Sequence, residues 1–148
     1  MSNKIKLVFI LCAVSTLTSC MQNNGEILQR SQRFADFSHS ISPSGTYKAI
    51  IEEFNNNGVS SYKLYIANTI YNDNKFETDL TFRRRDRNFV FWADDDDILW
   101  ANSGDIGTFF WVKEHDSWVQ MAFFENRDAK VPQALKEVLP RLYGFGDH

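Results

Sequence analysis

The sequence predicts a mainly β fold, an antiparallel meander or small sandwich of about six to eight strands with a short C-terminal helix. Three observations predict it. Apolar residues recur at every second position in several segments, which is the period of a strand. Turn-forming residues separate these segments. Aromatic residues, which favour strands and bury large areas, are abundant, with 13 Phe, 5 Tyr and 4 Trp in 148 residues.

The clearest hairpin is predicted near the start of the domain. Ser42-Pro43-Ser44-Gly45 is typical of a tight turn, and a strand follows at residues 47–51. Asn55-Asn56-Asn57-Gly58 then reverses the chain. On the return strand, apolar residues occupy alternate positions at Tyr62, Leu64 and Ile66.

Further strands are predicted between residues 76 and 124. The next strand has a spacing of two, at Phe76, Thr78, Leu80 and Phe82. The run Phe89–Trp92 is nearly continuous in apolar residues, which is typical of a central strand covered on both faces. The remaining strands are expected at 98–101, 108–113 and 118–124, separated by turns at Ser103-Gly104-Asp105 and 114–117.

Only the C-terminal end predicts a helix. Pro132 suits the first turn of a helix, and Gly144 can close it. Between them, the apolar residues Ala134, Leu135, Val138 and Leu139 fall on one side. This helix could cover an open face of the sheet, and dimerisation is the alternative.

The first twenty residues have the order of an export signal. Lys4 and Lys6 precede an apolar stretch from Leu7 to Val14, and small and polar residues follow. The stretch is too short to span a bilayer, which needs about 20 apolar residues. It ends in Leu17-Thr18-Ser19-Cys20.

This segment resembles the signal peptide and lipobox of bacterial lipoproteins. The resemblance implies cleavage before Cys20 and attachment of diacylglycerol to its thiol. It also implies an acyl chain, such as palmitate, on the new amino group. More than one lipid chain is needed to anchor a protein stably in a membrane. The residue after Cys20 is Met21 and not Asp, which by the resemblance is compatible with sorting to the outer membrane, facing the periplasm, in a cell that has one. The alternative is an ordinary secretory signal that contains a cysteine.

The predicted organisation is a signal peptide at 1–19, a flexible tether at 20–32 and a single mainly β domain at 33–148. Cys12 would leave with the leader and Cys20 would carry lipid, so the domain has no disulfide or catalytic thiol. The formal net charge is −3, and it becomes more negative when Lys4 and Lys6 leave with the signal peptide. A negative net charge argues against a nucleic-acid partner. The oligomeric state stays open.

Two charged runs are candidate sites. The aspartates Asp94–Asp97, including Asp95 and Asp96, supply oxygen ligands that calcium selects, but the spacing does not match an EF-hand and a solvated turn is the favoured interpretation. Arg83, Arg84, Arg85 and Arg87 could bind phosphate in two-pronged fashion. The favoured alternative is that these arginines point outward and pair with acids such as Asp86 or the aspartate run.

The segment from Trp100 to Trp111 is the preferred functional surface. Gly104 and Gly107 permit a sharply turned loop around Asp105, and Trp100, Trp111 and Trp118 could form an aromatic platform for a sugar or a protein side chain. The favoured alternative is that these tryptophans form a buried core.

Catalysis has little support in the sequence. His39, His115 and His148 lack zinc-type spacing, and Ser103 beside Asp105 lacks the context of a hydrolase serine. No catalytic residue, metal or cofactor is predicted.

The sequence therefore predicts a non-enzymatic binding domain, attached to the membrane through lipid on Cys20. Its partner would be an envelope or secreted protein, as for an inhibitor, an immunity-type protein or an accessory subunit of an envelope complex. The alternative is a module that binds glycan or lipid through exposed aromatics and arginines.

Overall fold

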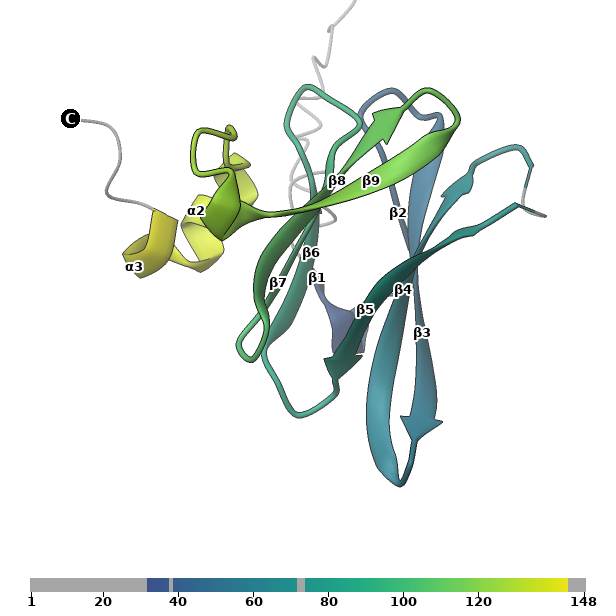
Figure 1. Cartoon of the computed structure of the whole chain (residues 1–148), viewed down its shortest axis with the longest axis vertical. Helices are drawn as coiled ribbons and strands as arrows, with labels where there is room; N and C mark the ends of the chain where they lie inside the picture. The colour runs from purple at the N-terminus through teal and green to yellow at the C-terminus, as the bar shows by residue number, and fades with distance from the viewer. Residues whose placement is uncertain (1–31, 38, 72–73, 144–148) are drawn as a thin grey trace, which may run out of the picture.

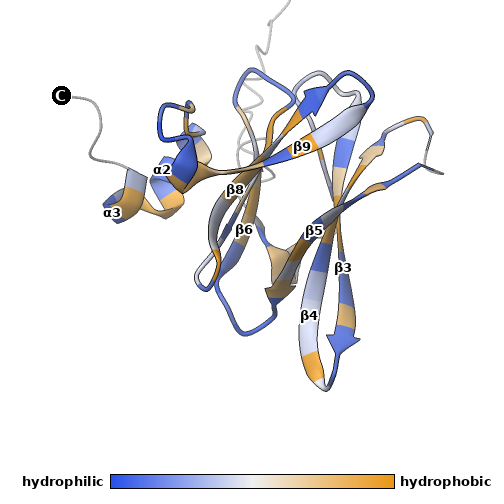
Figure 2. Cartoon of the chain, in the orientation of Figure 1, coloured by the Kyte–Doolittle hydropathy of each residue, from blue (hydrophilic) through white to orange (hydrophobic). Residues whose placement is uncertain are grey.

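The computed structural model of the protein describes residues 32–37, 39–71 and 74–143. Within these residues the fold is mainly β, which confirms the prediction (Figure 1). In the described part of the chain, nine strands form two antiparallel sheets, and β1 has only two residues. Hydrophilic residues gather in loops, most plainly in the loop that joins β5 to β6 (Figure 2).

The four-stranded sheet is a meander, in which strands adjacent in sequence are adjacent in space. Its strands are β2 (His39–Ile41), β3 (Tyr47–Asn56), β4 (Val59–Asn68) and β5 (Phe76–Arg83). The predicted hairpin is β3–β4. Asn57 and Gly58 connect its strands with positive φ angles of 51° and 84°, as a type I′ turn requires.

The five-stranded sheet has the order β1-β6-β7-β8-β9. Its strands are β1 (Gln32–Arg33), β6 (Asn88–Trp92), β7 (Leu99–Ser103), β8 (Gly107–Glu114) and β9 (Ser117–Ala122). The sequence places Gln32 in the tether, whereas here it pairs with Val90 of β6. A two-residue strand has no alternation, so its sequence gives no sign of it.

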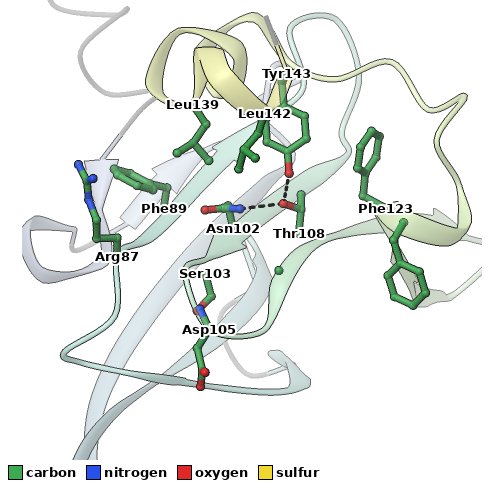
Figure 3. A pocket seen from close by; sticks show the side chains of 13 residues that line it. Arg87, Phe89, Asn102, Ser103, Asp105, Thr108, Phe123, Leu139, Leu142 and Tyr143 are labelled. Atoms are coloured by element: carbon green, nitrogen blue, oxygen red, sulfur yellow. Dashed lines mark hydrogen bonds between the residues drawn. The ribbon is translucent and has the colours of Figure 1, made fainter. Parts of the chain in front are cut away.

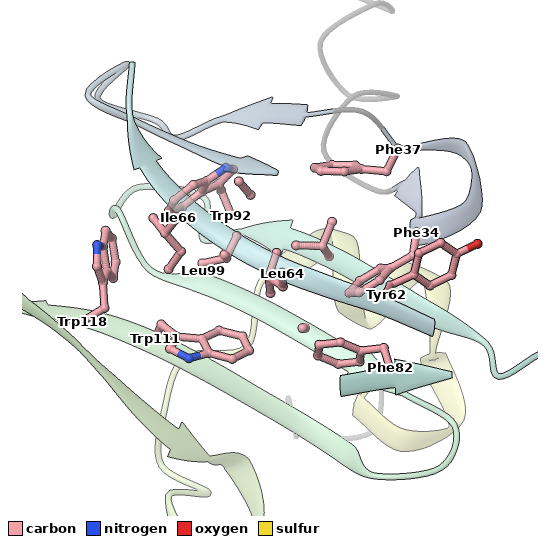
Figure 4. Close-up of a cluster of buried hydrophobic side chains, with 13 residues drawn as sticks. Phe34, Phe37, Tyr62, Leu64, Ile66, Phe82, Trp92, Leu99, Trp111 and Trp118 are labelled. Atoms are coloured by element: carbon pink, nitrogen blue, oxygen red, sulfur yellow. The ribbon is translucent and has the colours of Figure 1, made fainter. Parts of the chain in front are cut away.

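The inner faces of the two sheets share one core (Figure 4). Leu64 and Ile66 of β4 pack in the same cluster as Leu99 of β7 and Trp111 of β8. The 3-10 helix η1 (Phe34–Asp36) adds Phe34, which is also buried in this cluster. The two sheets therefore form a sandwich, because both are hydrophobic on the faces that meet.

The opposite face of the five-stranded sheet is covered by α2 (Gln133–Val138) and α3 (Pro140–Tyr143), on the side away from the four-stranded sheet (Figure 1). The fully buried Leu135 packs in one cluster with Phe91, Trp100 and Phe110. Every residue of β6 and β7 is buried in consequence. This confirms the expectation of a central strand at Phe89–Trp92 and of a helix that covers a sheet face.

The helical end differs in detail from the prediction. Pro132 lies before α2, as its N-cap, instead of in its first turn. A second short helix then begins at Pro140, because proline has no N–H with which to continue α2. Gly144, the predicted end of the helix, lies outside the described residues. Among the helices of the described part, none has the length and apolar character needed to cross a membrane.

Candidate functional site

An open groove lies between the turn that joins β7 to β8 and the C-terminal helices (Figure 3). Its volume is about 450 Å³ and its lining is mostly apolar. We call it the C-terminal groove and define it by Phe89, Asn102, Thr108, Phe123, Leu142 and Tyr143.

Polar side chains inside the groove are joined in one hydrogen-bond network (Figure 3). Asn102 Nδ2 donates to Thr108 Oγ1 at 2.8 Å, and the Thr108 hydroxyl is also hydrogen-bonded to the Tyr143 hydroxyl. Asn102 is only 6% exposed, so its amide depends on this partner. The network ties α3 to β7 and β8 and thereby fixes one wall of the groove.

Large apolar side chains remain exposed around the groove. Phe124 is 65% exposed and Leu142 is 67% exposed, and both line it. Leu142 continues the apolar positions of Leu135 and Leu139, which are packed against the sheet. Because Pro140 starts a new helix, Leu142 leaves that packed stripe and meets solvent.

This arrangement suits binding. Concave sites that bind ligands or partner side chains are usually apolar, with a few polar groups that fix orientation. Here Phe123 and Leu142 supply apolar walls, and Asn102 and Thr108 supply polar groups.

Trp100, Trp111 and Trp118 do not form a platform on the surface. Trp100 is 1% exposed and Trp111 is 0% exposed, and they pack into different clusters on opposite faces of the five-stranded sheet. Trp118 is also buried, between the sheets with Trp111. Pairing of Trp100 with Phe110 and of Leu99 with Trp111 fixes this arrangement, so the alternative of a buried core holds.

The turn within the same segment does reach the groove. Ser103, Gly104, Asp105 and Gly107 line its edge, so the sequence located part of the site. Asp105 is exposed and lies 3.5 Å from Arg83 Nη1. Its carboxylate marks the polar end of the groove.

The aspartate run forms the turn between β6 and β7, as favoured from the sequence. Asp94 Oδ2 accepts a hydrogen bond from the backbone N–H of Gln133 at 3.1 Å. Asp97 accepts one from the backbone N–H of Ser44 at 3.1 Å and one from the Ser44 hydroxyl at 2.6 Å. The exposed Asp95 pairs with Lys130 at 3.1 Å, and this hydrogen bond raises the pKa of Lys130. Asp96 is exposed. The run thus bonds to two separate segments of the chain, the turn at Ser44 and residues 130–133.

The arginine run lies in the turn between β5 and β6. Arg84 Nη1 lies 3.0 Å from Glu53 Oε1, and Arg85 Nε lies 4.0 Å from Asp86 Oδ1. Both arginine side chains are exposed and ion-paired, as the favoured interpretation expects. The acidic partners of the arginine run are Glu53, Asp86 and Asp105, whereas the aspartate run bonds elsewhere.

Several groove residues were not predicted from the sequence to belong to a site. Phe123, Phe124, Leu142 and Tyr143 were read as strand or helix residues with no site role. The available signal was the apolar Leu142, two residues beyond the helix-breaking Pro140. The position of Phe89 in the groove had no local signal, because it depends on which face of β6 the helices cover.

Among the described residues, no group of three or more His, Cys, Asp or Glu side chains is arranged to hold a metal ion. Cys20, the predicted lipid site, lies outside the described residues. Comparison of the chain with protein-family models, with curated proteins and with solved structures found no match.

Proposed function

We propose that the protein is a lipid-anchored component of the bacterial cell envelope whose domain binds a partner protein and catalyses no reaction. Lipid on Cys20 holds the domain at the membrane, facing the periplasm from the outer membrane in a cell that has one. The partner is an envelope or secreted protein. The role is that of an inhibitor, an immunity-type protein or an accessory subunit of an envelope complex.

The observation that supports binding is the C-terminal groove with two large apolar side chains exposed around it. Leaving Phe124 and Leu142 in water is unfavourable, and clustered exposed apolar residues mark protein interaction sites. A partner that inserts an apolar side chain would desolvate the groove and both residues together. With Trp100, Trp111 and Trp118 buried, the alternative of a glycan- or lipid-binding module would use other exposed aromatics, such as Phe124, and the arginines.

The first test places a photo-crosslinking residue at position 142 of the full chain in its native cells. We expect a defined protein adduct that mass spectrometry can identify. The matched control places the same residue at Ile70, which is 79% exposed and lies in the loop after β4 of the other sheet. An adduct that forms equally at both positions would argue against the groove as the binding surface.

The second test measures the affinity of the purified partner for Leu142→Asp and Phe124→Asp. We expect each to weaken binding at least about tenfold, because a carboxylate must be desolvated in an apolar contact. Ile70→Asp introduces the same charge elsewhere and should leave affinity unchanged. Unfolding of all three variants in urea checks that the fold is intact, and unchanged affinity in both groove variants would overturn the proposal.

A further inference from the structure

A second, smaller cavity of about 190 Å³ lies beside the C-terminal groove. We call it the arginine cavity and define it by Arg33, Arg84, Arg85, Asp86 and Arg87. Arg87 lines both this cavity and the groove. The two sites therefore share one residue, Arg87.

The fold brings these arginines together from two distant segments. Arg33 lies on β1, where it pairs with Phe89 of β6, next to the loop that carries residues 84–87. Backbone bonds hold that loop, from Arg84 N to Ser60 O at 3.0 Å and from Asp86 N to Arg83 O at 3.1 Å. Asn88 Nδ2 adds a bond to Arg83 O at 2.8 Å. The loop backbone is thus fixed before any ligand binds.

The charges in the cavity are not balanced. Arg84 is paired with Glu53 at 3.0 Å. The ion pair between Arg85 and Asp86 is longer, at 4.0 Å. Within the described part of the chain, Arg33 and Arg87 form no ion pair with an acidic side chain. Two guanidinium groups are therefore uncompensated in a chain whose formal charge is −3. Like charges that line one cavity repel one another, and an anion bound there would reduce this repulsion.

We propose that the arginine cavity binds a phosphate monoester. Guanidinium groups donate paired hydrogen bonds to phosphate oxygens, and a monoester offers three terminal oxygens to several donors at once. Its charge of about −1.5 to −2 at pH 7 matches the two uncompensated arginines, whereas a carboxylate supplies only one charge. This site is separate from the proposed partner-binding function.

The monoester has two possible sources, a soluble phosphate ester or a lipid headgroup. An extended chain from Cys20 to Arg33 spans at most about 45 Å, so the proposed anchor would keep the cavity near membrane phosphates. Because Arg87 also lines the apolar groove, an acyl chain on the bound phosphate would have an adjoining apolar surface.

The test is thermal unfolding of the full chain, purified in a nonionic detergent, with inorganic phosphate against chloride at equal ionic strength. We expect phosphate to raise Tm by several degrees, because a ligand that binds only the native state stabilises it. Arg33→Gln/Arg87→Gln, which removes the two arginines without an acidic partner, should abolish this rise. The matched control Arg127→Gln/Arg141→Gln removes two arginines that do not line the cavity and should retain it. No rise in the wild-type protein, or an equal rise in both double variants, would overturn the proposal.

Glycerol 3-phosphate and monomeric dihexanoyl phosphatidic acid distinguish the sources by isothermal titration calorimetry. Equal affinity for the two would indicate a soluble ester. At least tenfold tighter binding of the lipid, lost in Leu142→Asp, would indicate a headgroup whose chains contact the groove. Failure of both to bind would overturn the phosphate site and leave the partner-binding tests unaffected.

Discussion

Asp94 provides the N-terminal cap of a helix that begins 39 residues further along the chain. Its Oδ2 atom accepts a hydrogen bond from the backbone N–H of Gln133, the first residue of α2, at 3.1 Å. The preceding residue, Pro132, has no side chain that can cap the helix, and the first turn contains no acidic residue. The turn between β6 and β7 therefore supplies what the sequence of α2 lacks, which positions the helices that form the groove.

Asp94→Ala should lower the free energy of unfolding by about 0.5–2 kcal/mol, the usual cost of losing a helix cap. Urea unfolding followed by tryptophan fluorescence measures it. Asp96→Ala is the control, because Asp96 is exposed in the same turn, and it should change stability by less than about 0.5 kcal/mol. Equal losses in the two variants would show that the turn, and not the cap, is responsible.

Thr108→Val should lower the free energy of unfolding by about 1–3 kcal/mol, because it leaves the buried Asn102 amide without its acceptor. Tyr143→Phe removes only one partner of the Thr108 hydroxyl and should cost about 0.5–1.5 kcal/mol. A double-mutant cycle of these two changes measures their coupling. Strict additivity would mean that the network does not act as a unit.

Gly107→Ala should be destabilising by about 1–2 kcal/mol, because Gly107 has a φ angle of +92°, which disfavours any residue with a Cβ. Gly104→Ala, three residues earlier in the same turn, is the matched control. Its φ angle is not positive, and its new Cβ would meet Arg87 N at 3.7 Å, an ordinary contact distance. If chemical denaturation shows that Gly104→Ala lowers the free energy of unfolding as much as Gly107→Ala does, the positive φ of Gly107 does not explain the loss.

Stability should fall as the pH rises above about 10. Burial raises the pKa of Tyr65 above its ordinary value of 10.0, and a hydrogen bond to Glu52 raises the pKa of Lys75 above 10.5. Both groups hold their protons more tightly in the folded state, so over this window the folded protein binds more protons and loses stability as pH increases.

Unfolding in urea at a series of alkaline pH values tests this. Tyr65→Phe and Lys75→Met should each make the decline shallower, because each removes one group whose pKa differs between the two states. The Lys75 contribution should be small, since that side chain is 38% exposed and its ion pair with Glu52 is screened. A decline that is identical in both variants and the wild-type protein would contradict the assignment.

How far the sequence predicts the candidate site can be judged from two segments. The turn at Gly104 and Asp105 was recognised, because glycine and aspartate determine turns through neighbouring residues. For the tryptophans on either side, the sequence left open a surface platform beside the favoured buried core, and Trp100 and Trp111 are buried. Their burial depends on the strand register of β7 and β8 and on the layers that cover each face, and neither is visible in a short segment.

The sequence by itself determined the class of the fold and most strand positions. The period of two, the Asn57-Gly58 turn and the apolar run at Phe89–Trp92 act through residues near in sequence, so a local pattern carries them. Only the tertiary structure decided which residues form the groove and the arginine cavity. Tyr143 is hydrogen-bonded to Thr108, and Arg33 lines the same cavity as residues 84–87, although these segments are far apart in sequence. Such contacts follow from the packing of whole elements, because each sheet face and helix must bury its apolar side against another.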